Sequence, residues 1–152
     1  MNNILIVDNE PTMRMVLKVL LGQLPQNNPA SQATIYEANN GMKALELCDA
    51  INFDLVLMDL SMDGMDGIET TERILEAHPE TNVLVISMHN HDGTMRLLKR
   101  IGARGYLVKD RLHKELTPAL ETIAEGGTHF KTTMQSGPRY RPQPNAGLFR
   151  RV

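Results

Sequence analysis

Four polar residues of unlike chemistry each follow a short apolar run of the chain. Asp8 follows the run 4–7, Asp59 follows 55–58, Ser87 follows 83–86 and Lys109 follows 106–108. One apolar run that stops at a polar residue means little, because such endings are common. Two carboxylates, a hydroxyl and an ammonium group at four such endings form a set with a shared chemistry.

That chemistry is the transfer of a phosphoryl group. Two carboxylates at one edge of a sheet suit a hard cation such as Mg²⁺, which takes a few oxygen ligands and keeps several waters. Asp59 could attack phosphorus as a nucleophile, since carboxylates form acyl phosphates. Lys109 would neutralise phosphoryl oxygens, and Ser87 would donate a hydrogen bond to another. Little else is needed, because such transfer depends mostly on positioning and electrostatics.

The segments around these residues predict alternating strands and helices. We expect strands at 4–7, 33–37, 55–58, 83–86 and 106–108, and helices at 11–24, 41–51, 67–77, 93–102 and 112–125. Three of the strands are apolar without alternation, which is typical of strands buried on both faces. Five strand–helix units predict an α/β fold with a doubly wound, five-stranded parallel sheet and five helices. In such sheets ligands bind at the carboxyl ends of the strands.

Composition limits the class of protein. The chain has 152 residues and is 41% hydrophobic, which fits one globular domain. We find no apolar run long enough to span a membrane and no basic leader, so we expect no membrane partner and a cytoplasmic location. The single cysteine, Cys48, excludes an internal disulfide and a cysteine-based metal site. We expect it to be a buried and unreactive helix residue.

Charge divides the chain into two parts. Residues 131–152 hold five Lys or Arg and no acid, whereas residues 1–130 hold 11 basic and 18 acidic side chains. An acidic body disfavours nucleic acid as a partner, because phosphate contacts need a basic face. Residues 131–152 also contain Pro and Gly and too few apolar positions for a helix-turn-helix unit. We expect a domain at 1–130, followed by a flexible basic tail without a DNA-binding domain.

Four motifs resemble those of response-regulator receiver domains of bacterial two-component systems. They are Ile-Leu-Ile-Val-Asp at 4–8, Leu-Val-Leu-Met-Asp-Leu-Ser-Met-Asp-Gly-Met-Asp-Gly at 55–67, Val-Leu-Val-Ile-Ser at 83–87 and Gly-Ala-Arg-Gly-Tyr-Leu-Val-Lys at 102–109. Their order and spacing match over about residues 3–128. Ser-Met-His at 87–89 and Gly-Tyr-Leu-Val-Lys-Asp at 105–110 are closer to the NarL/LuxR branch. The resemblance implies a flavodoxin-like strand order, 2-1-3-4-5.

The resemblance implies a role for each residue at the strand ends. Asp59 would accept a phosphoryl group from a phosphohistidine on a sensor histidine kinase or a phosphotransfer protein. Asp8, Asp59 and the backbone carbonyl of Ser61 would hold Mg²⁺, and Lys109 would contact the phosphoryl group. The protein would be an acceptor that also loses its phosphoryl group by itself, and not an enzyme of ordinary turnover.

The resemblance also implies a switch. Ser87 would bond the phosphoryl group and shift, and the inward or outward position of Tyr106 would follow. The surface of the fourth helix, fifth strand and fifth helix would then act on a downstream partner protein. A homodimer stays open as an alternative.

Three positions differ from the usual pattern of the family. Asn9 replaces the second acid after the first strand, so one negative charge is lost and metal affinity should fall, although an amide oxygen can still bind the metal. Asp63 stands where Pro is usual. Asp110 also stands where Pro is common, although the NarL/LuxR branch often has Asp there.

Structural explanations remain for each of these residues. Asp59 could cap a loop, Asp8 or Asn9 could cap the helix near Pro11, Lys109 could lie on the surface, Ser87 could bond local backbone, and Tyr106 could be a strand aromatic with a solvated hydroxyl. We interpret Gly64 and Gly67 as turn residues that supply positive φ. His89 and His91 are expected in a solvated loop and not as metal ligands.

Two other functions compete with the phosphorylated switch. A receiver-like interaction module would bind partners without phosphorylation, and Asn9 and Asp63 favour it. A flavin- or nucleotide-binding protein would need a glycine-rich phosphate cradle, which Asp-Asn-Glu-Pro-Thr at 8–12 does not provide. The chain could also be the truncated receiver of a DNA-binding response regulator.

Overall fold

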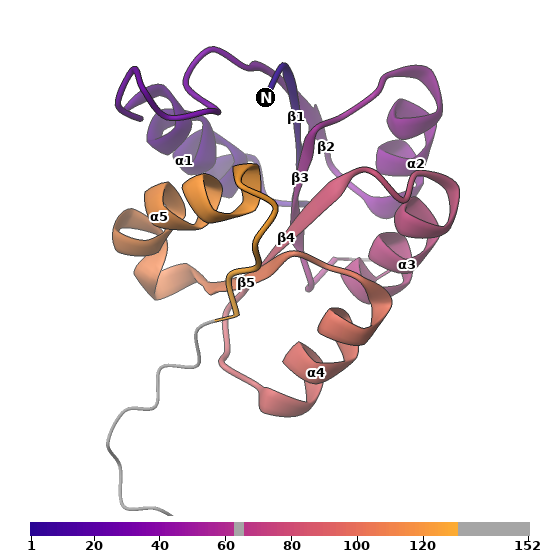
Figure 1. The fold of residues 1–152 in the computed structure, drawn as a ribbon. Helices are drawn as coiled ribbons and strands as arrows, with labels where there is room; N and C mark the ends of the chain where they lie inside the picture. Colours follow the sequence, from indigo (N-terminus) through magenta and orange to yellow (C-terminus); the bar gives the residue numbers. More distant parts are fainter. Residues whose placement is uncertain (63–65, 131–152) are drawn as a thin grey trace, which may run out of the picture.

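The computed structural model describes residues 1–62 and 66–130, which form a parallel sheet with helices on both faces (Figure 1). The strands are β1 (Asn3–Val7), β2 (Thr34–Ala38), β3 (Leu55–Asp59), β4 (Asn82–Ser87) and β5 (Gly105–Val108). The helices are α1 (Pro11–Gly22), α2 (Gly41–Ala50), α3 (Gly67–Ala77), α4 (Asp92–Ile101) and α5 (Leu112–Ala124), and a 3₁₀ turn (Lys109–Arg111) precedes α5. The predictions for Asp63, Gly64 and the basic tail 131–152 lie outside the described residues.

The strands are paired in the order β2-β1-β3-β4-β5, all parallel. The expected fold class and strand order are therefore confirmed, and each predicted strand lies within one residue of its observed bounds. The central strands β1, β3 and β4 are almost wholly buried, which explains their unbroken apolar sequences.

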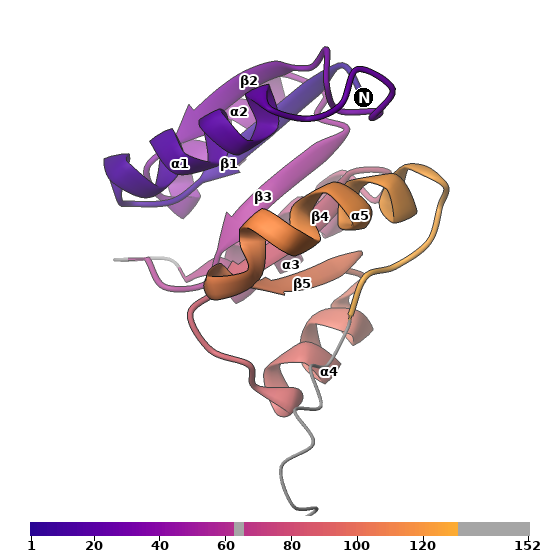
Figure 2. The same cartoon turned by 90° about the vertical axis from the view of Figure 1, so that its left-hand side faces the viewer.

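The helices form two layers, one on each face of the sheet. Helices α1 and α5 lie together on one side and α2, α3 and α4 on the other, as the two views show (Figures 1 and 2). Each layer covers its own apolar core: Leu17 and Leu120 belong to the first, and Ile74 and Leu98 to the second. No helix in the described ranges is long and apolar enough to cross a membrane.

Local sequence explains where most of these helices begin. Pro11 occupies the first turn of α1, where its missing N–H costs nothing. The side chains of Asn40 and Asp66 accept N–H bonds at the starts of α2 and α3, and the ring of His91 accepts the Thr94 N–H at the start of α4. His91 is exposed and acts as a helix cap. Over residues 1–62 and 66–130, no cluster of three His, Cys, Asp or Glu side chains could hold a metal ion.

Cys48 lies in the core on α2, as expected. Its side chain is 5% exposed, and burial raises the pKa of its thiol to about 11. Because the thiolate is the reactive form, this cysteine is a packing residue.

Gly67 is required by a close approach and not by positive φ. Of the described residues, only Gly102 and Gly126 have positive φ, so our reason for Gly67 was wrong. A Cβ at Gly67 would lie 2.2 Å from the Asp59 carbonyl oxygen and 2.7 Å from the Leu60 Cα. The first turn of α3 therefore packs directly on the backbone at the end of β3.

We expect Gly67→Ala to lower the free energy of unfolding by about 2–3 kcal/mol, because rigid backbone atoms must move to admit the methyl group. Gly22→Ala is the matched control. Nothing lies within 4 Å of a Cβ at Gly22, and alanine is the better helix former, so a gain of about 0.5–1 kcal/mol is expected. Urea unfolding of both variants measures the difference. Similar effects of the two substitutions would show that the contact at Asp59 is unimportant.

Candidate functional site

The register of the sheet brings Asp8 and Asp59 to the same edge. Val7 is paired with Met58 in the β1–β3 ladder, so the residues that follow them, Asp8 and Asp59, end their strands at one level. The chain leaves β1 for α1 on one face of the sheet and leaves β3 for α3 on the other (Figure 1). Strands whose connections diverge in this way form a topological switch point, where ligands bind in open α/β sheets.

Lys109 comes to the same place from β5. Its ammonium nitrogen lies 3.4 Å from Asp59 Oδ1 and 3.8 Å from Asp8 Oδ2. The Lys109 side chain is 13% exposed, so it is not a lysine that extends into water. The structure therefore brings together the two carboxylates and the cation that the strand ends predicted.

The electrostatics of this group are unbalanced. Burial raises the pKa of Asp8, and the neighbouring charge of Asp59 raises it further, while the Glu10 N–H and Lys109 act in the opposite direction. Burial also raises the pKa of Asp59, against the lowering effects of Lys109 and the Ser61 N–H. One ammonium group thus offsets only part of the cost of burying two carboxylates. The pocket favours additional positive charge.

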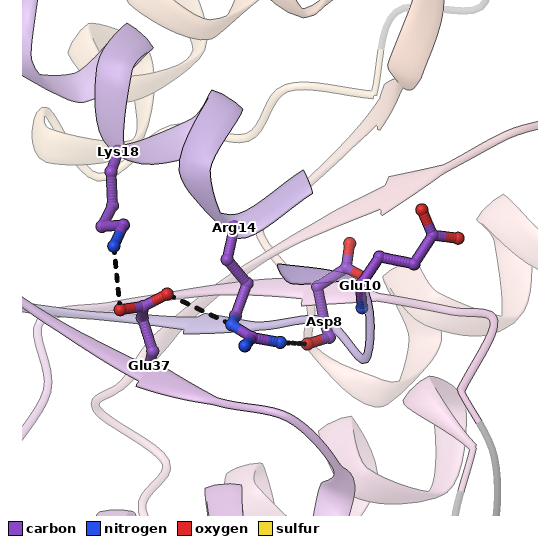
Figure 3. Close-up of polar contacts among 5 residues, drawn as sticks. All are labelled: Asp8, Glu10, Arg14, Lys18 and Glu37. Carbon is purple, nitrogen blue, oxygen red and sulfur yellow. Dashed lines mark hydrogen bonds and ion pairs between the residues drawn. The ribbon is translucent and has the colours of Figure 1, made fainter. Parts of the chain in front are cut away.

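Backbone donors hold both carboxylates in place. The Glu10 N–H donates to Asp8 Oδ1 at 2.9 Å, and the Ser61 N–H donates to Asp59 Oδ1 at 3.3 Å. No side chain caps the start of α1, so neither Asp8 nor Asn9 serves as that cap. Asn9 is half-buried in the bend between β1 and α1. Glu10 is exposed, and Figure 3 shows its carboxylate pointing away from Arg14.

The side chains of Ser87 and Tyr106 both form hydrogen bonds to the main chain of His89. Ser87 Oγ accepts the His89 N–H at 3.3 Å, and the Tyr106 hydroxyl donates to the His89 carbonyl oxygen. Tyr106 is 2% exposed and points inward, so its hydroxyl is bonded to backbone and is not solvated. The main chain of His89 therefore links the two residues that we predicted to act together.

Arg14 is a residue of the site that the sequence did not reveal to us. Its guanidinium donates to the Asp8 carbonyl oxygen at 2.7 Å and to Glu37 Oε1 on β2 at 3.1 Å (Figure 3). Lys18 also pairs with Glu37, and Lys18 and Arg14 together lower the pKa of that carboxyl. One signal was present: a cation near the start of a helix opposes the helix dipole and suggests another role.

The residues at the pocket fit a hard divalent cation. Asp8 and Asp59 supply two carboxylates, buried at one edge of the sheet with an unbalanced negative charge. Mg²⁺ needs only one or two carboxylates, because it keeps several waters. The Asn9 amide, directly after Asp8, and the Ser61 carbonyl, two residues after Asp59, are further oxygen donors, and neither carries a charge.

A sequence model described as the response regulator receiver domain matches residues 4–121. The nitrate/nitrite response regulator protein NarL of Escherichia coli K12 is 34% identical over 123 residues, which are 81% of this chain and 55% of that protein. The transcriptional regulatory protein DegU of Brevibacillus brevis is 30% identical over 140 residues, or 91% of this chain and 57% of that protein. The chain spans about half the length of the curated relatives it matches.

Solved structures give the same fold. A two-component response regulator of the LuxR family from Aurantimonas sp. SI85-9A1 is similar with a TM-score of 0.75 and 28% sequence identity. The similarity covers 84% of this chain and 87% of the other.

We expect Asp59→Asn to raise the free energy of unfolding by about 0.5–2 kcal/mol near pH 7 in magnesium-free buffer. The folded carboxyl has the higher pKa, so the unfolded state loses its proton first and wild-type stability falls as the pH rises through the raised pKa. The gain should shrink as the pH approaches 3.8, where both states become protonated. Urea unfolding across this pH range tests it.

The control for that experiment is Glu72→Gln, an exposed acid on α3 whose replacement should change stability by no more than about 0.5 kcal/mol at any pH. An Asp59→Asn variant less stable than wild type near pH 7 would contradict the unbalanced charge of the pocket.

We expect Arg14→Gln to lower the free energy of unfolding by about 1–2 kcal/mol, because the Asp8 carbonyl and Glu37 lose a charged donor. Lys18→Gln removes only an exposed partner of Glu37 and should change stability by about 0.5 kcal/mol or less. Urea unfolding compares the two. Equal costs would show that the bond to Asp8 contributes nothing.

Proposed function

The chain belongs to the response regulator receiver domain family, and on that premise we propose that Asp59 accepts a phosphoryl group from a phosphohistidine. The donor would be a sensor histidine kinase or a phosphotransfer protein. The observation that carries the proposal is the Lys109 ammonium, 3.4 Å from the buried carboxylate of Asp59. A cation held beside a buried nucleophile is what phosphoryl transfer to a carboxylate needs.

In the transfer, a carboxylate oxygen of Asp59 attacks phosphorus on the side opposite the histidine nitrogen. The new O–P bond forms while the N–P bond breaks, and the electron pair of that bond stays on the imidazole. Lys109 compensates the charge on the phosphoryl oxygens as it shifts. Later attack of water on phosphorus would restore the carboxylate and release phosphate.

Asp8, Asp59 and the Ser61 carbonyl are the ligands that we propose for Mg²⁺, with Asn9 as a further oxygen donor. When bound, the ion supplies charge neutralisation for the phosphoryl group. Because Asn9 is neutral, the ligand set has one negative charge fewer than a site with an acid there, and we expect weaker binding.

The switch that we propose runs through the main chain of His89. The Ser87 hydroxyl can turn its proton toward a phosphoryl oxygen on Asp59, which would draw the β4–α4 loop toward the site. Tyr106 is bonded to the carbonyl of the same residue, so its ring would follow. A few kcal/mol of preference between two such arrangements is enough to shift their populations.

The output surface would be α4, β5 and α5, together with the segment at His129 that bonds to β5. The Tyr106 N–H donates to the carbonyl oxygen of His129 at 2.9 Å, and the His129 N–H donates to the Arg104 carbonyl at 2.8 Å. The described chain thus ends against the edge strand that carries Tyr106. A downstream partner protein, or further sequence in a longer protein, would read the change there. We propose that the protein acts in the cytoplasm, where its phosphodonors work.

The test is the mass of the protein after incubation with a small phosphodonor and Mg²⁺. We expect wild type to gain the mass of one phosphoryl group, and Asp59→Asn to gain none. Omitting Mg²⁺ should slow the gain, because the ion neutralises the developing charge. An unchanged wild-type mass, or an equal gain of mass in Asp59→Asn, would contradict the proposal.

Hydrogen exchange on the same samples separates a switch from a passive acceptor. Phosphorylation should alter exchange of the His89 and Tyr106 amides in wild type and leave Asp59→Asn unchanged. The second candidate, an interaction module that works without phosphorylation, is favoured by Asn9. It would be supported by an unphosphorylated wild type whose partner binding survives Asp59→Ala.

A further inference from the structure

Both backbone polar groups of Asp8 are connected to the edge strand β2. The Asp8 N–H donates to the Ala38 carbonyl oxygen at 3.1 Å. The Asp8 carbonyl oxygen accepts from the Arg14 guanidinium at 2.7 Å, and the same guanidinium donates to Glu37 Oε1 at 3.1 Å (Figure 3). Glu37 and Ala38 are consecutive residues of β2. Asp8 is therefore tied to β2 twice, directly through its N–H and through Arg14 at its carbonyl.

Arg14 also holds the other end of the turn between β1 and α1. That turn consists of Asp8, Asn9 and Glu10. Arg14 is the fourth residue of α1, and its own N–H donates to the Glu10 carbonyl oxygen at 3.1 Å. One residue thus binds the first carbonyl of the turn with its side chain and the last with its main chain. The Asp8 carbonyl belongs to the planar peptide group that leads into Asn9, so the position of Asn9 depends on this bond as well.

The Arg14 side chain is itself held in place by Glu37. A guanidinium group is planar and its N–H groups have fixed directions, so a bond to Glu37 orients the N–H that reaches Asp8. The Arg14 side chain is 17% exposed, whereas Lys18, the other partner of Glu37, is 44% exposed. An exposed ion pair contributes little, so we assign the clamp to Arg14 and Glu37.

We propose that Arg14, clamped by Glu37, is a positioning residue for the Mg²⁺ site. It bonds to the Asp8 carbonyl and not to the carboxylate, so it acts by placing Asp8 and Asn9. The inference rests on the proposed function, which makes these two residues donors to the ion. Mg²⁺ demands near-ideal octahedral geometry. Because Asn9 contributes no charge, more of the affinity depends on oxygen donors that are already in place.

Placement and charge predict opposite results when Arg14 is removed. A cation near a metal site repels the metal ion, so loss of its charge alone would strengthen Mg²⁺ binding. Loss of the bond to the Asp8 carbonyl frees the turn and weakens Mg²⁺ binding. A residue that only stabilises the fold would leave the affinity of the folded protein unchanged. The direction of the change therefore identifies the role of Arg14.

Calorimetric titration of magnesium chloride into the unphosphorylated full chain tests the proposal. We expect Arg14→Gln to raise the Mg²⁺ dissociation constant at least about tenfold. Arg14→Lys keeps the charge and loses the planar fork, and it should raise the constant at least about fivefold. Arg73→Gln is the matched control, because it removes an exposed arginine of α3 that pairs with Glu69. It should change the constant by no more than about twofold. Circular dichroism checks that each variant is folded.

A second pair of variants tests the clamp. Glu37→Ala should raise the dissociation constant at least about threefold in the wild-type background, because the guanidinium loses its anchor on β2. In the Arg14→Gln background the same substitution should have an effect of less than about 1.5-fold, since Glu37 acts through Arg14. Independent contributions of the two residues would instead multiply.

Hydrogen exchange of the Glu10 amide reports on the turn without any metal ion. This N–H donates to Asp8 Oδ1 at 2.9 Å. We expect Arg14→Gln to speed its exchange at least about fivefold in magnesium-free buffer, because the turn opens locally. The Glu69 amide donates to Asp66 Oδ1 at 2.7 Å at the start of α3 and is the matched control. Its exchange should stay as in wild type.

An Arg14→Gln variant that binds Mg²⁺ as tightly as wild type, or more tightly, would overturn the proposal. So would an Arg14→Lys variant equal to wild type, or an unchanged exchange rate of the Glu10 amide in Arg14→Gln. In each of these cases wild type still binds Mg²⁺, so the proposed ligands stand. A wild type without measurable Mg²⁺ binding would contradict the ligand set itself, and the role of Arg14 with it.

Discussion

The burial of two carboxylates beside one ammonium group is the constraint on which the rest of this structure depends. The parallel register of β1 and β3 forces Asp8 and Asp59 to one level, and a third strand end delivers Lys109 to both. Both carboxylates are buried, so water screens their mutual repulsion only weakly and does not solvate their charges fully. The single ammonium group of Lys109 does not balance the two carboxylates. The site therefore favours binding of a cation and reactions in which negative charge moves.

Backbone contacts around the pocket connect it to the neighbouring elements of the fold. The Asp8 carbonyl is fixed by Arg14, the Asp59 carbonyl is packed against the first turn of α3, and the His89 peptide groups are held by Ser87 and Tyr106. Each contact ties a loop at the carboxyl edge of the sheet to a neighbouring element. A change of charge at Asp59 would therefore be felt in the loops, since a packed interior transmits displacement and does not absorb it.

The two faces of the sheet are covered by helices that carry different surface charges. The α1 side carries Arg14 and Lys18, and both pair with Glu37 on β2. The α3–α4 side carries exposed acids on α3, among them Glu72 and Glu76, and exposed bases on α4, among them Arg96 and Arg100. Exposed ion pairs within one molecule contribute little to stability.

The sequence by itself determined the order of elements, the parallel sheet and the residues at its strand ends. Unbroken apolar runs that stop at Asp8, Asp59 and Ser87 specify buried strands, and strand ends in such a sheet share one edge by geometry. Only the tertiary structure decided the contacts made by backbone groups: Arg14 on the Asp8 carbonyl, the His89 bridge, and the lack of space at Gly67. Side-chain type marks burial and charge along the chain, but a carbonyl oxygen is the same at every residue. Which carbonyl receives a donor depends on how distant segments pack.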